Sequence, residues 1–457
     1  MSIYVNRVLN MKAIDAIGFD MDHTLVRYYS DRFEELTFKI TIEKLIASGN
    51  YPKEELEKFK FDFNRAIRGL IVDKENGNIL KVSLYNKIKA SYHGTRQLTY
   101  KEQLRIYHGS SVDLAEEKYS SVDTTFSIAF TVIFSQLVQL KDNIDSSDLL
   151  PSYAEMADDV VRAVDEGHRD GTIKNQVLKH LDHYIIPDEE IVTVLERFKA
   201  YGKKLWIITN SDYKYTKALL DYTINPFLKG HKHWSDLFEI TITLASKPRF
   251  FTDHLPFLKV NPETGMMENF DQKITSGIFQ GGHATKLQRD LGLRGDQILY
   301  LGDHIYGDIL KLKKSCDWRT ALVLEELDRE VKAYKSTKDY SIKIDELMEK
   351  KIVLEKEIDE LYAQEYEYKN EVDKKTLNEK FKAIEKLDKE LGVLIKKYES
   401  HFNTNWGEVM RAGAEPSSFA LQIERYACIY MSKISDFKNY SPRNYYRPKK
   451  RKIAHEM

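Results

Sequence analysis

The chain has 457 residues, of which 42% are hydrophobic and 31% are charged, and its 70 Lys and Arg residues nearly balance its 71 Asp and Glu residues. This composition is typical of a globular protein, and the length predicts about three domains or subdomains. The even charge gives no electrostatic support for a nucleic-acid-binding protein, because such binding domains are usually basic.

The cysteine count and the hydropathy pattern argue against further classes. The chain has two cysteines, Cys316 and Cys428, and no Cys/His cluster, so neither a structural zinc site nor a disulfide framework is expected. No segment approaches the roughly 18 consecutive apolar residues of a membrane helix. The first residues also lack the apolar stretch and cleavage site of a secretory signal peptide. We therefore expect a cytoplasmic protein with neither a membrane nor a nucleic acid as partner.

The first predicted strand, at residues 13–19, is short, apolar and followed directly by Asp20 and Asp22 in the sequence GFDMDHTLV. Side chains two positions apart on an extended chain point the same way, and two close carboxylates repel unless a cation lies between them. Mg²⁺ prefers oxygen ligands. An aspartate beside such a metal can attack phosphorus, while a second acid protonates the leaving alkoxide. Alone, this pair is weak evidence, because Asp-x-Asp is common by chance.

The residues between this strand and the next predicted one, which begins near residue 203, are too many for a loop. The apolar spacing predicts helices within residues 41–67 and 126–140. We therefore predict a mainly helical cap domain that is inserted after the first strand and folded over the sheet.

Two later segments resemble the first strand. Residues 203–212 (KKLWIITNSD) and 296–304 (DQILYLGDH) are apolar runs that end in polar residues, and each follows an amphipathic helical pattern, at residues 188–202 and 284–295. Strands that alternate with helices predict a parallel α/β sheet. Ligands bind beyond the carboxyl ends of such strands, so the polar ends are expected to meet in one site.

The polar residues at these strand ends suit phosphoryl transfer. Thr209 and Asn210 can hold a phosphoryl oxygen, and Lys247, after another apolar run, can neutralise the charge of the transition state. Asp303 and Asp308 can complete a metal site, Asp308 either directly or through water. Thr209 and Asn210 also fit an ordinary turn, Lys247 an ordinary surface lysine, and Asp308 a helix N-cap.

The remainder of the chain is predicted to form a long helical hairpin at residues 343–399, which serves either as a solvated appendage or as an oligomerisation arm. The last residues, RPKKRKIAHEM, are basic and are expected to be a solvated end. The predicted domains are a core at 1–30 plus 185–340, the cap at 31–184, the hairpin at 341–400, and a C-terminal segment at 401–457 that packs on the core.

The motifs occur in a specific order: DxDxT after a strand, then strand-Thr-Asn, then Lys, then strand-GDxxxxD. This order resembles the four-motif signature of the haloacid dehalogenase superfamily. The resemblance implies a Rossmannoid parallel-sheet core with a cap. It also implies that Asp20 is the nucleophile and Asp22 the general acid and base, with Mg²⁺ between them.

Over residues 13–330 the chain is similar to the cytosolic purine 5′-nucleotidases that prefer IMP and GMP. The similarity is carried by FDMDHTL, IRGLIVDKENGNILKV, TNSDYKYT and ILYLGDHIYGDILKLKKSCDWRTALV. It implies that Asp20 and Asp303 bind the metal through their side chains and Asp22 through its backbone carbonyl, with Asp308 supporting the metal shell. It further implies that the phosphoryl group is bound by Thr209, Asn210 and Lys247, and that Ser211 of the TNSD motif contacts the substrate.

The same resemblance places base recognition in residues 158–174 (DDVVRAVDEGHRDGTIK), where Asp165, His168 and Lys174 match the family. On a helix, Asp165 and His168 share a face. The acid can accept N1–H of hypoxanthine or guanine, which adenine lacks, while His168 stacks on the purine, with Phe126 as the opposite partner.

The chain differs from the family at one position of this segment. The family has an arginine four residues before the residue that matches Asp165. Val161 holds that position here, and Arg162 lies next to it, turned by roughly 100° on an ideal helix. Either Arg162 rotates toward the base, or base recognition differs.

The resemblance also implies phosphotransfer to nucleosides, activation by a purine nucleotide effector, and a homo-oligomer, either dimer or tetramer. The main hypothesis is therefore a magnesium-dependent 5′-nucleotidase for IMP and GMP. The alternatives are a haloacid dehalogenase-type phosphatase for another ester, such as a sugar phosphate or a pyrimidine nucleotide, and a catalytically silent nucleotide-binding scaffold.

Overall fold

The computed structural model describes residues 2–109, 111–144 and 150–449. The chain forms two compact units, one made of Leu327–Val409 and the other of the residues before and after it. Of the basic C-terminal end, residues 450–457 lie outside the described residues. Among the described residues, no helix is both long enough and apolar enough to span a membrane.

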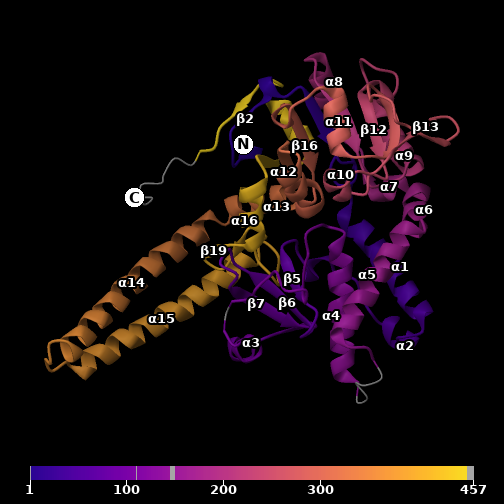
Figure 1. Ribbon diagram of the computed structural model, residues 1–457. Helices are drawn as coiled ribbons and strands as arrows, with labels where there is room; N and C mark the ends of the chain where they lie inside the picture. Colours follow the sequence, from indigo (N-terminus) through magenta and orange to yellow (C-terminus); the bar gives the residue numbers. More distant parts are fainter. Residues whose placement is uncertain (1, 110, 145–149, 450–457) are drawn as a thin grey trace. The chain divides into compact units, whose positions relative to one another are not determined.

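The first unit is built on a ten-stranded sheet (Figure 1). The strands from β20 to β15 are parallel, with antiparallel β1 at one edge and antiparallel β13 and β14 at the other. This mostly parallel α/β sheet confirms the expected fold class. The order across the sheet is β1 (Ile3–Val5), β20 (Ile429–Met431), β17 (Arg319–Val323), β16 (Ile298–Gly302), β3 (Ala16–Phe19), β11 (Lys204–Ile208), β12 (Phe238–Thr243), β15 (Gly277–Gly281), β13 (Phe257–Val260) and β14 (Met267–Asn269).

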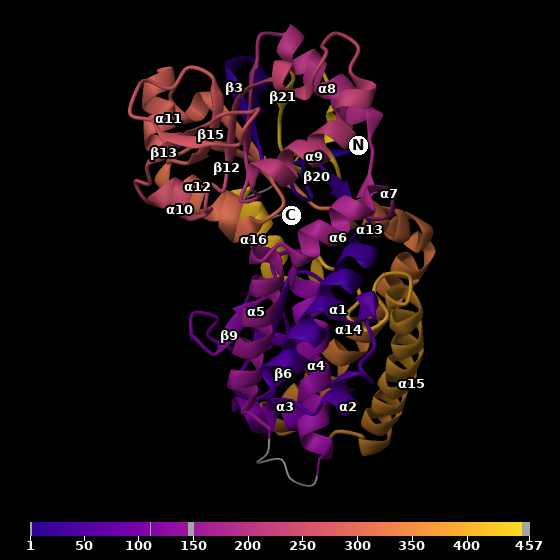
Figure 2. The same cartoon turned by 90° about the vertical axis from the view of Figure 1, so that its right-hand side faces the viewer.

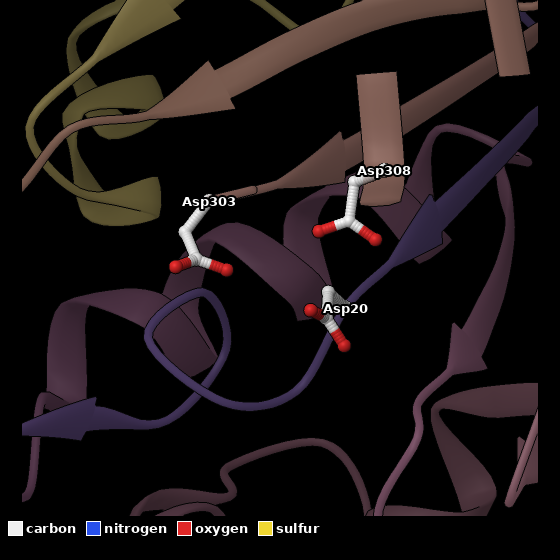
Figure 3. A group of neighbouring side chains, drawn as sticks. All are labelled: Asp20, Asp303 and Asp308. Carbon is white, nitrogen blue, oxygen red and sulfur yellow. The ribbon is translucent and has the colours of Figure 1, made fainter. Parts of the chain in front are cut away.

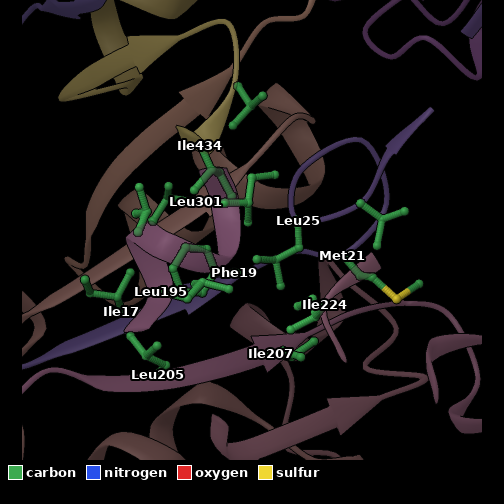
Figure 4. Close-up of a cluster of buried hydrophobic side chains, with 14 of the residues drawn as sticks. Ile17, Phe19, Met21, Leu25, Leu195, Leu205, Ile207, Ile224, Leu301 and Ile434 are labelled. Carbon is green, nitrogen blue, oxygen red and sulfur yellow. The ribbon is translucent and has the colours of Figure 1, made fainter. Parts of the chain in front are cut away.

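The central strands are apolar because both of their faces are covered. Side chains alternate along a strand, so Ile17 and Phe19 of β3 join the apolar cluster drawn in Figure 4, whereas Ala16 joins the cluster on the opposite face. The first cluster includes residues of α8 (Glu189–Ala200) and α9 (Tyr213–Thr223), and the second includes residues of α10 (Arg249–Thr252), α11 (Ala284–Leu291) and α12 (Lys311–Ser315). Burial on both faces leaves the strand ends as the place for polar chemistry.

The segment 31–184, here called the cap segment, leaves and rejoins the sheet through two short paired strands, β4 (Arg27–Tyr28) and β10 (Ile185–Ile186). Both the cap segment and the sheet belong to the first compact unit, so their separation into two domains stays a prediction. Three helices of the segment pack side by side (Figure 2). They are α1 (Ser30–Ser48), α4 (Ser127–Asn143) and α5 (Tyr153–Arg169), and the segment also holds α2 (Lys53–Leu56), α3 (Tyr100–Tyr107), α6 (Thr172–Lys179) and α7 (Leu181–Tyr184).

Two features of the cap segment differ from expectation. The helical pattern at residues 41–67 is broken, because α1 ends at Gly49, which adopts φ 76°, and Pro52 then precedes α2. The mainly helical cap also contains a five-stranded antiparallel sheet, whose short apolar runs do not by themselves distinguish strand from helix. Its order is β8 (Arg96–Gln97), β7 (Ile88–His93), β6 (Asn78–Val82), β5 (Leu70–Asp73) and β9 (Tyr119–Ser121).

The second unit contains the expected helical hairpin, formed by α14 (Lys338–Tyr366) and α15 (Lys374–Glu399). A small cluster that includes Leu347, Leu391 and Leu394 holds the two helices together. In the first unit, the C-terminal segment continues with α16 (Ser418–Tyr426) and adds two strands to sheets. Strand β20 lies between β17 and β1, and β21 (Tyr445–Tyr446) pairs with β2 (Leu9–Asn10).

Candidate active site

Three buried carboxylates meet at the carboxyl ends of two neighbouring strands (Figure 3). Asp20 follows β3, and Asp303 follows β16, which pairs with β3 in parallel register. Asp308 belongs to a π-helical turn, η7 (Ile305–Leu310). One oxygen from each carboxylate lies within 4.8 Å of the others. The sheet thus brings Asp20 together with two acids, Asp303 and Asp308, that lie much later in the sequence.

The carboxylates are held where their charge is unfavourable. Burial, together with the nearby acids, raises the pKa of Asp20 well above its ordinary value, although Lys247 lowers it. Burial also raises the pKa of Asp303, and the charge of Asp308 adds to this effect. Neighbouring carboxylates ionise together only when cations compensate them. The site is therefore built to hold positive charge.

The donor set fits a divalent cation. Oδ2 of Asp303 is buried and has no hydrogen-bond partner among the described residues. Mg²⁺ takes oxygen ligands and keeps several of its positions for water and phosphate. Three carboxylate ligands, one of them with an unpartnered oxygen, are consistent with such a site, and binding of Mg²⁺ itself stays a proposal.

Lys247 supplies one cation from the protein. Its Nζ lies 2.7 Å from Asp20 Oδ1 and 2.8 Å from Asp308 Oδ1, and it donates to the hydroxyl of Tyr300 at 3.0 Å. Burial by itself lowers the pKa of Lys247, but the two carboxylates outweigh this effect and raise the pKa to about 12. The ammonium group therefore stays charged and fixed beside the proposed nucleophile.

Asp22 lies close to the triad of Asp20, Asp303 and Asp308 but contacts different partners. Its Oδ1 accepts a hydrogen bond from the hydroxyl of Tyr28 at 2.5 Å, and its Oδ2 accepts one from the hydroxyl of Ser211 at 2.8 Å. The predicted substrate contact Ser211 thus engages Asp22 with its side chain. The two carboxylates of the DxD pair are therefore held in different environments.

Thr209 and Asn210 lie at the end of β11. Thr209 is fully buried, and its Oγ1 accepts the backbone N–H of Ser211 at 3.0 Å. Asn210 forms two hydrogen bonds with the backbone of Lys247. Its Oδ1 accepts the Lys247 N–H at 2.6 Å, and its Nδ2 donates to the Lys247 carbonyl at 3.2 Å. Asn210 therefore positions the segment that carries Lys247.

Two adjoining cavities open onto these residues. The smaller one, of about 150 Å³, is lined by the triad and Lys247, and the larger one, of about 1160 Å³, extends toward the cap segment. Both are lined by Asp22, Thr124, Phe126 and Asn210. A small acidic chamber thus continues into a space large enough for an organic ligand.

The cap wall of the larger cavity carries the predicted base-binding residues Asp165, His168 and Lys174. Lys174 pairs with Asp212 at 2.9 Å. Burial and the charge of Lys174 lower the pKa of His168 to about 4, so its imidazole is neutral at neutral pH. The ring of His168 contacts Phe126 edge-on, at 5.6 Å and 82°, so a purine does not fit between these two rings in the present arrangement.

Arg162 is a predicted binding residue that the structure keeps away from the cavity. Its side chain is exposed and pairs with Asp159, whereas Val161 lines the cavity. Helical geometry explains this, because Val161, Asp165 and His168 share one face of α5 and Arg162 is turned away from it. Of the two resolutions left open by the sequence, rotation of Arg162 toward the base is not observed. Another arginine of the same helix, Arg169, does line the cavity.

Several residues of the site were not predicted from the sequence, because they lie outside the motifs or were not singled out within them. They are Tyr28 on β4, which contacts Asp22, Tyr300 on β16, which contacts Lys247, and Arg169 on α5, which lines the larger cavity. His304, inside the GDHIYGD motif, lines the smaller cavity. The clue for Tyr300 was a polar hydroxyl in an otherwise apolar run, because a buried tyrosine hydroxyl usually has a partner.

Comparisons with known proteins identify the family of the chain. The chain is 27% identical over 465 residues to a 5′-nucleotidase domain-containing protein of Dictyostelium discoideum. This match covers 100% of the present chain and 75% of the Dictyostelium protein. It is 25% identical to human 5′-nucleotidase domain-containing protein 2, covering 100% of this chain and 85% of the human protein. A structure described as a predicted phosphoglycolate phosphatase from Haemophilus somnus covers 68% of this chain and 85% of its own, with 14% identity and a TM-score of 0.28, too low to support a conclusion. The sequence profile of the 5′ nucleotidase family matches residues 3–457, and the chain therefore belongs to this family.

Proposed function

We propose that the protein is a magnesium-dependent 5′-nucleotidase that hydrolyses 6-oxopurine nucleoside monophosphates, IMP and GMP, through an aspartyl-phosphate on Asp20. The observation that carries the proposal is the convergence of Asp20, Asp303 and Asp308 with Lys247 in a buried chamber that opens into a large cavity. Family membership supports the nucleotidase chemistry.

The metal would be held by the carboxylates of Asp20, Asp303 and Asp308, and the family resemblance adds the backbone carbonyl of Asp22. When bound, Mg²⁺ supplies charge neutralisation for the phosphoryl oxygens. The protein's own contribution from Lys247 is a fixed positive charge 2.7 Å from Asp20, which stabilises the charge that develops during transfer.

Asp20 attacks phosphorus in line with the 5′-oxygen. As the new bond to Asp20 forms, the bond to the 5′-oxygen breaks, and that oxygen takes the electron pair and a proton from Asp22. Asp22 then accepts a proton from a water molecule whose oxygen bonds to the phosphorus of the aspartyl-phosphate. The bond between phosphorus and the Asp20 oxygen breaks, its electron pair returns to the Asp20 carboxylate, and phosphate is released. If a nucleoside replaces water in the second step, the phosphoryl group is transferred to it instead.

Selection of the base is assigned to the cap wall of the larger cavity. Asp165 accepts N1–H of a 6-oxopurine, and neutral His168 offers a flat surface for stacking. Arg169, one turn after Asp165 on α5, supplies the guanidinium that Arg162 does not bring to the cavity, and it suits the O6 carbonyl. Adenine presents donors where Arg169 also presents donors, so AMP is disfavoured.

The test is phosphate release from IMP, GMP, AMP, CMP and a sugar phosphate, with and without Mg²⁺, by the wild type and Asp20→Asn. The proposal predicts Mg²⁺-dependent turnover of IMP and GMP above AMP, and none in the variant. Turnover that ignores the base would keep the chemistry and remove the purine preference. Equal, slow release by wild type and variant would favour a silent nucleotide-binding scaffold.

A further inference from the structure

Asp22 is held through both of its carboxylate oxygens by two separate parts of the fold. The Tyr28 hydroxyl on β4 donates to Oδ1 at 2.5 Å, and the Ser211 hydroxyl, beyond the end of β11, donates to Oδ2 at 2.8 Å. Tyr28 and Ser211 are both buried, so neither is a mobile surface group. The two donors together fix the rotation of the carboxyl group about its own axis.

Tyr28 is itself fixed. Its ring stacks on His23 with centroids 4.6 Å apart and meets Phe33 edge-on at 5.1 Å. Its hydroxyl lies 3.1 Å from the hydroxyl of Tyr215 on α9. Because Tyr28 has one proton and gives it to Asp22, Tyr215 is the donor in this contact. The backbone is also held, because Tyr28 pairs with Ile185 where the two linker strands of the cap segment meet.

We propose that Tyr28 is a positioning residue for proton transfer, and this inference rests on the proposed nucleotidase function. Tyr28 holds Asp22 in the one orientation from which it reaches the leaving 5′-oxygen and afterwards the attacking water. Such a group must come within about 2.6–3.2 Å of the atom it serves. Each carboxylate oxygen has a second lone pair, so an oxygen that accepts from Tyr28 or Ser211 can still carry the transferred proton.

The inference predicts that the need for Tyr28 depends on the leaving group. A nucleoside leaves as an alkoxide and needs a proton from Asp22, whereas p-nitrophenolate is stable without one. Tyr28→Phe keeps the ring and its stacking contacts but removes the donor to Asp22. A merely structural role would lower activity toward both kinds of substrate by the same factor.

The experiment compares IMP and p-nitrophenyl phosphate in the wild type, Tyr28→Phe and the control Tyr29→Phe, which changes the neighbouring tyrosine. For IMP, kcat of Tyr28→Phe is expected to fall at least about tenfold with little change in KM, since general acid catalysis is worth about 10²–10⁴-fold. The rate of p-nitrophenolate release in the first turnover is expected to stay within about twofold of wild type. The control is expected to match the wild type on both substrates.

Equal losses on both substrates, or full activity of Tyr28→Phe on IMP, would overturn the inference while leaving the nucleotidase proposal intact. A wild type that releases nothing from either substrate would overturn the proposed function and this inference with it. Thermal unfolding of each variant checks folding. If Tyr28→Phe does not fold, Tyr215→Phe, which loosens the Tyr28 hydroxyl, must show a smaller loss confined to IMP, and the absence of such a loss would contradict the proposal.

Discussion

Asp303 shows how the buried acids of the site depend on a cation that the protein supplies only in part. Lys247 pairs with Asp20 and Asp308, whereas Oδ2 of Asp303 has no hydrogen-bond partner among the described residues. Burial raises the pKa of Asp303, so its ionised form is unfavourable in the folded protein. A bound divalent cation would reverse this balance.

We therefore expect Mg²⁺ to stabilise the wild type and to stabilise Asp303→Asn much less. A ligand at 100 times its Kd adds about 2.7 kcal/mol to the free energy of unfolding. Without metal, Asp303→Asn should be at least as stable as the wild type at neutral pH, because it removes a buried charge. Chemical denaturation with and without Mg²⁺ measures both effects. The control is Asp296→Asn, which changes an exposed acid just before β16, the strand that Asp303 follows. A wild-type stability that does not respond to Mg²⁺ would contradict the metal site.

The convergence of Asp20, Asp303, Asp308 and Lys247 could be predicted from the sequence, because each follows a predicted strand or apolar run in a fixed order. The same reasoning does not find Tyr28, Tyr300 and Arg169. These residues lie on β4, β16 and α5, and they meet at the site only when the chain has folded. The position of Arg162 depended on a rotation along α5 that the spacing left open.

At the scale of single elements, helix α4 depends on a carboxyl group from another helix. Its N-cap residue, Phe126, offers no side-chain hydrogen bond. Instead, Oε2 of Glu34, on α1, accepts the N–H of Ala129 at 2.8 Å. Glu34 is fully buried, and burial raises its pKa from the ordinary 4.5 to about 8, although the Ala129 N–H lowers it. This contact places the start of α4, and with it Phe126, beside the cavities.

Glu34 should make the stability of the protein fall as pH rises. Between pH 4.5 and about 8, the folded protein keeps a proton on Glu34 that the unfolded chain has lost. The contribution of this group to the free energy of unfolding therefore falls by about 1.4 kcal/mol per pH unit in this window and is constant above it. Glu34→Gln removes the titration and keeps an acceptor for Ala129.

Chemical denaturation at pH 5 and pH 8 tests this expectation. The stability of Glu34→Gln relative to the wild type should increase from the lower to the higher pH. Glu34→Ala, which also removes the acceptor, should lose about 1 kcal/mol more than the Gln variant, as helix N-caps do. A constant difference between wild type and Glu34→Gln at both pH values would show that Glu34 is ionised in the folded protein.

The three strands predicted from the sequence, at residues 13–19, 203–212 and 296–304, correspond to β3, β11 and β16, because buried parallel strands are apolar along their whole length. The small antiparallel sheet of the cap segment could not, because Leu70–Asp73 and Asn78–Val82 are short runs joined through a turn at Gly77. The break after α1 had a readable cause in Gly49 and Pro52, two residues that end and begin helices.

At the scale of the whole molecule, every residue proposed for the site belongs to the first compact unit, and the hairpin to the second. The helices α14 and α15 are linked by ion pairs such as Lys380 with Glu357. The sequence predicts this hairpin well, because its apolar residues recur at helical spacing. Its role as a solvated appendage or as an oligomerisation arm stays a prediction, which shortening the hairpin can test.

Removing residues 360–378 and closing the hairpin with a short glycine loop should leave IMP hydrolysis within about twofold of wild type, because no proposed catalytic group is touched. Light scattering of the same pair measures the molar mass. Fewer subunits per particle in the shortened protein would identify the hairpin as an oligomerisation arm, and an unchanged number of subunits would identify it as an appendage. A large loss of activity without a change in the number of subunits would contradict the assignment of the whole site to the first unit.

The proposed function requires that Asp20 carries the phosphoryl group during turnover, and trapping that group on the protein tests this requirement. Protein mixed with IMP labelled on phosphorus, in the presence of Mg²⁺, is quenched in acid, digested and mapped. We expect a label on Asp20 that hydroxylamine releases, as an acyl phosphate requires, and no label in Asp20→Asn. Turnover of IMP without any trapped label on Asp20, or a label on another residue, would contradict the proposed role of Asp20.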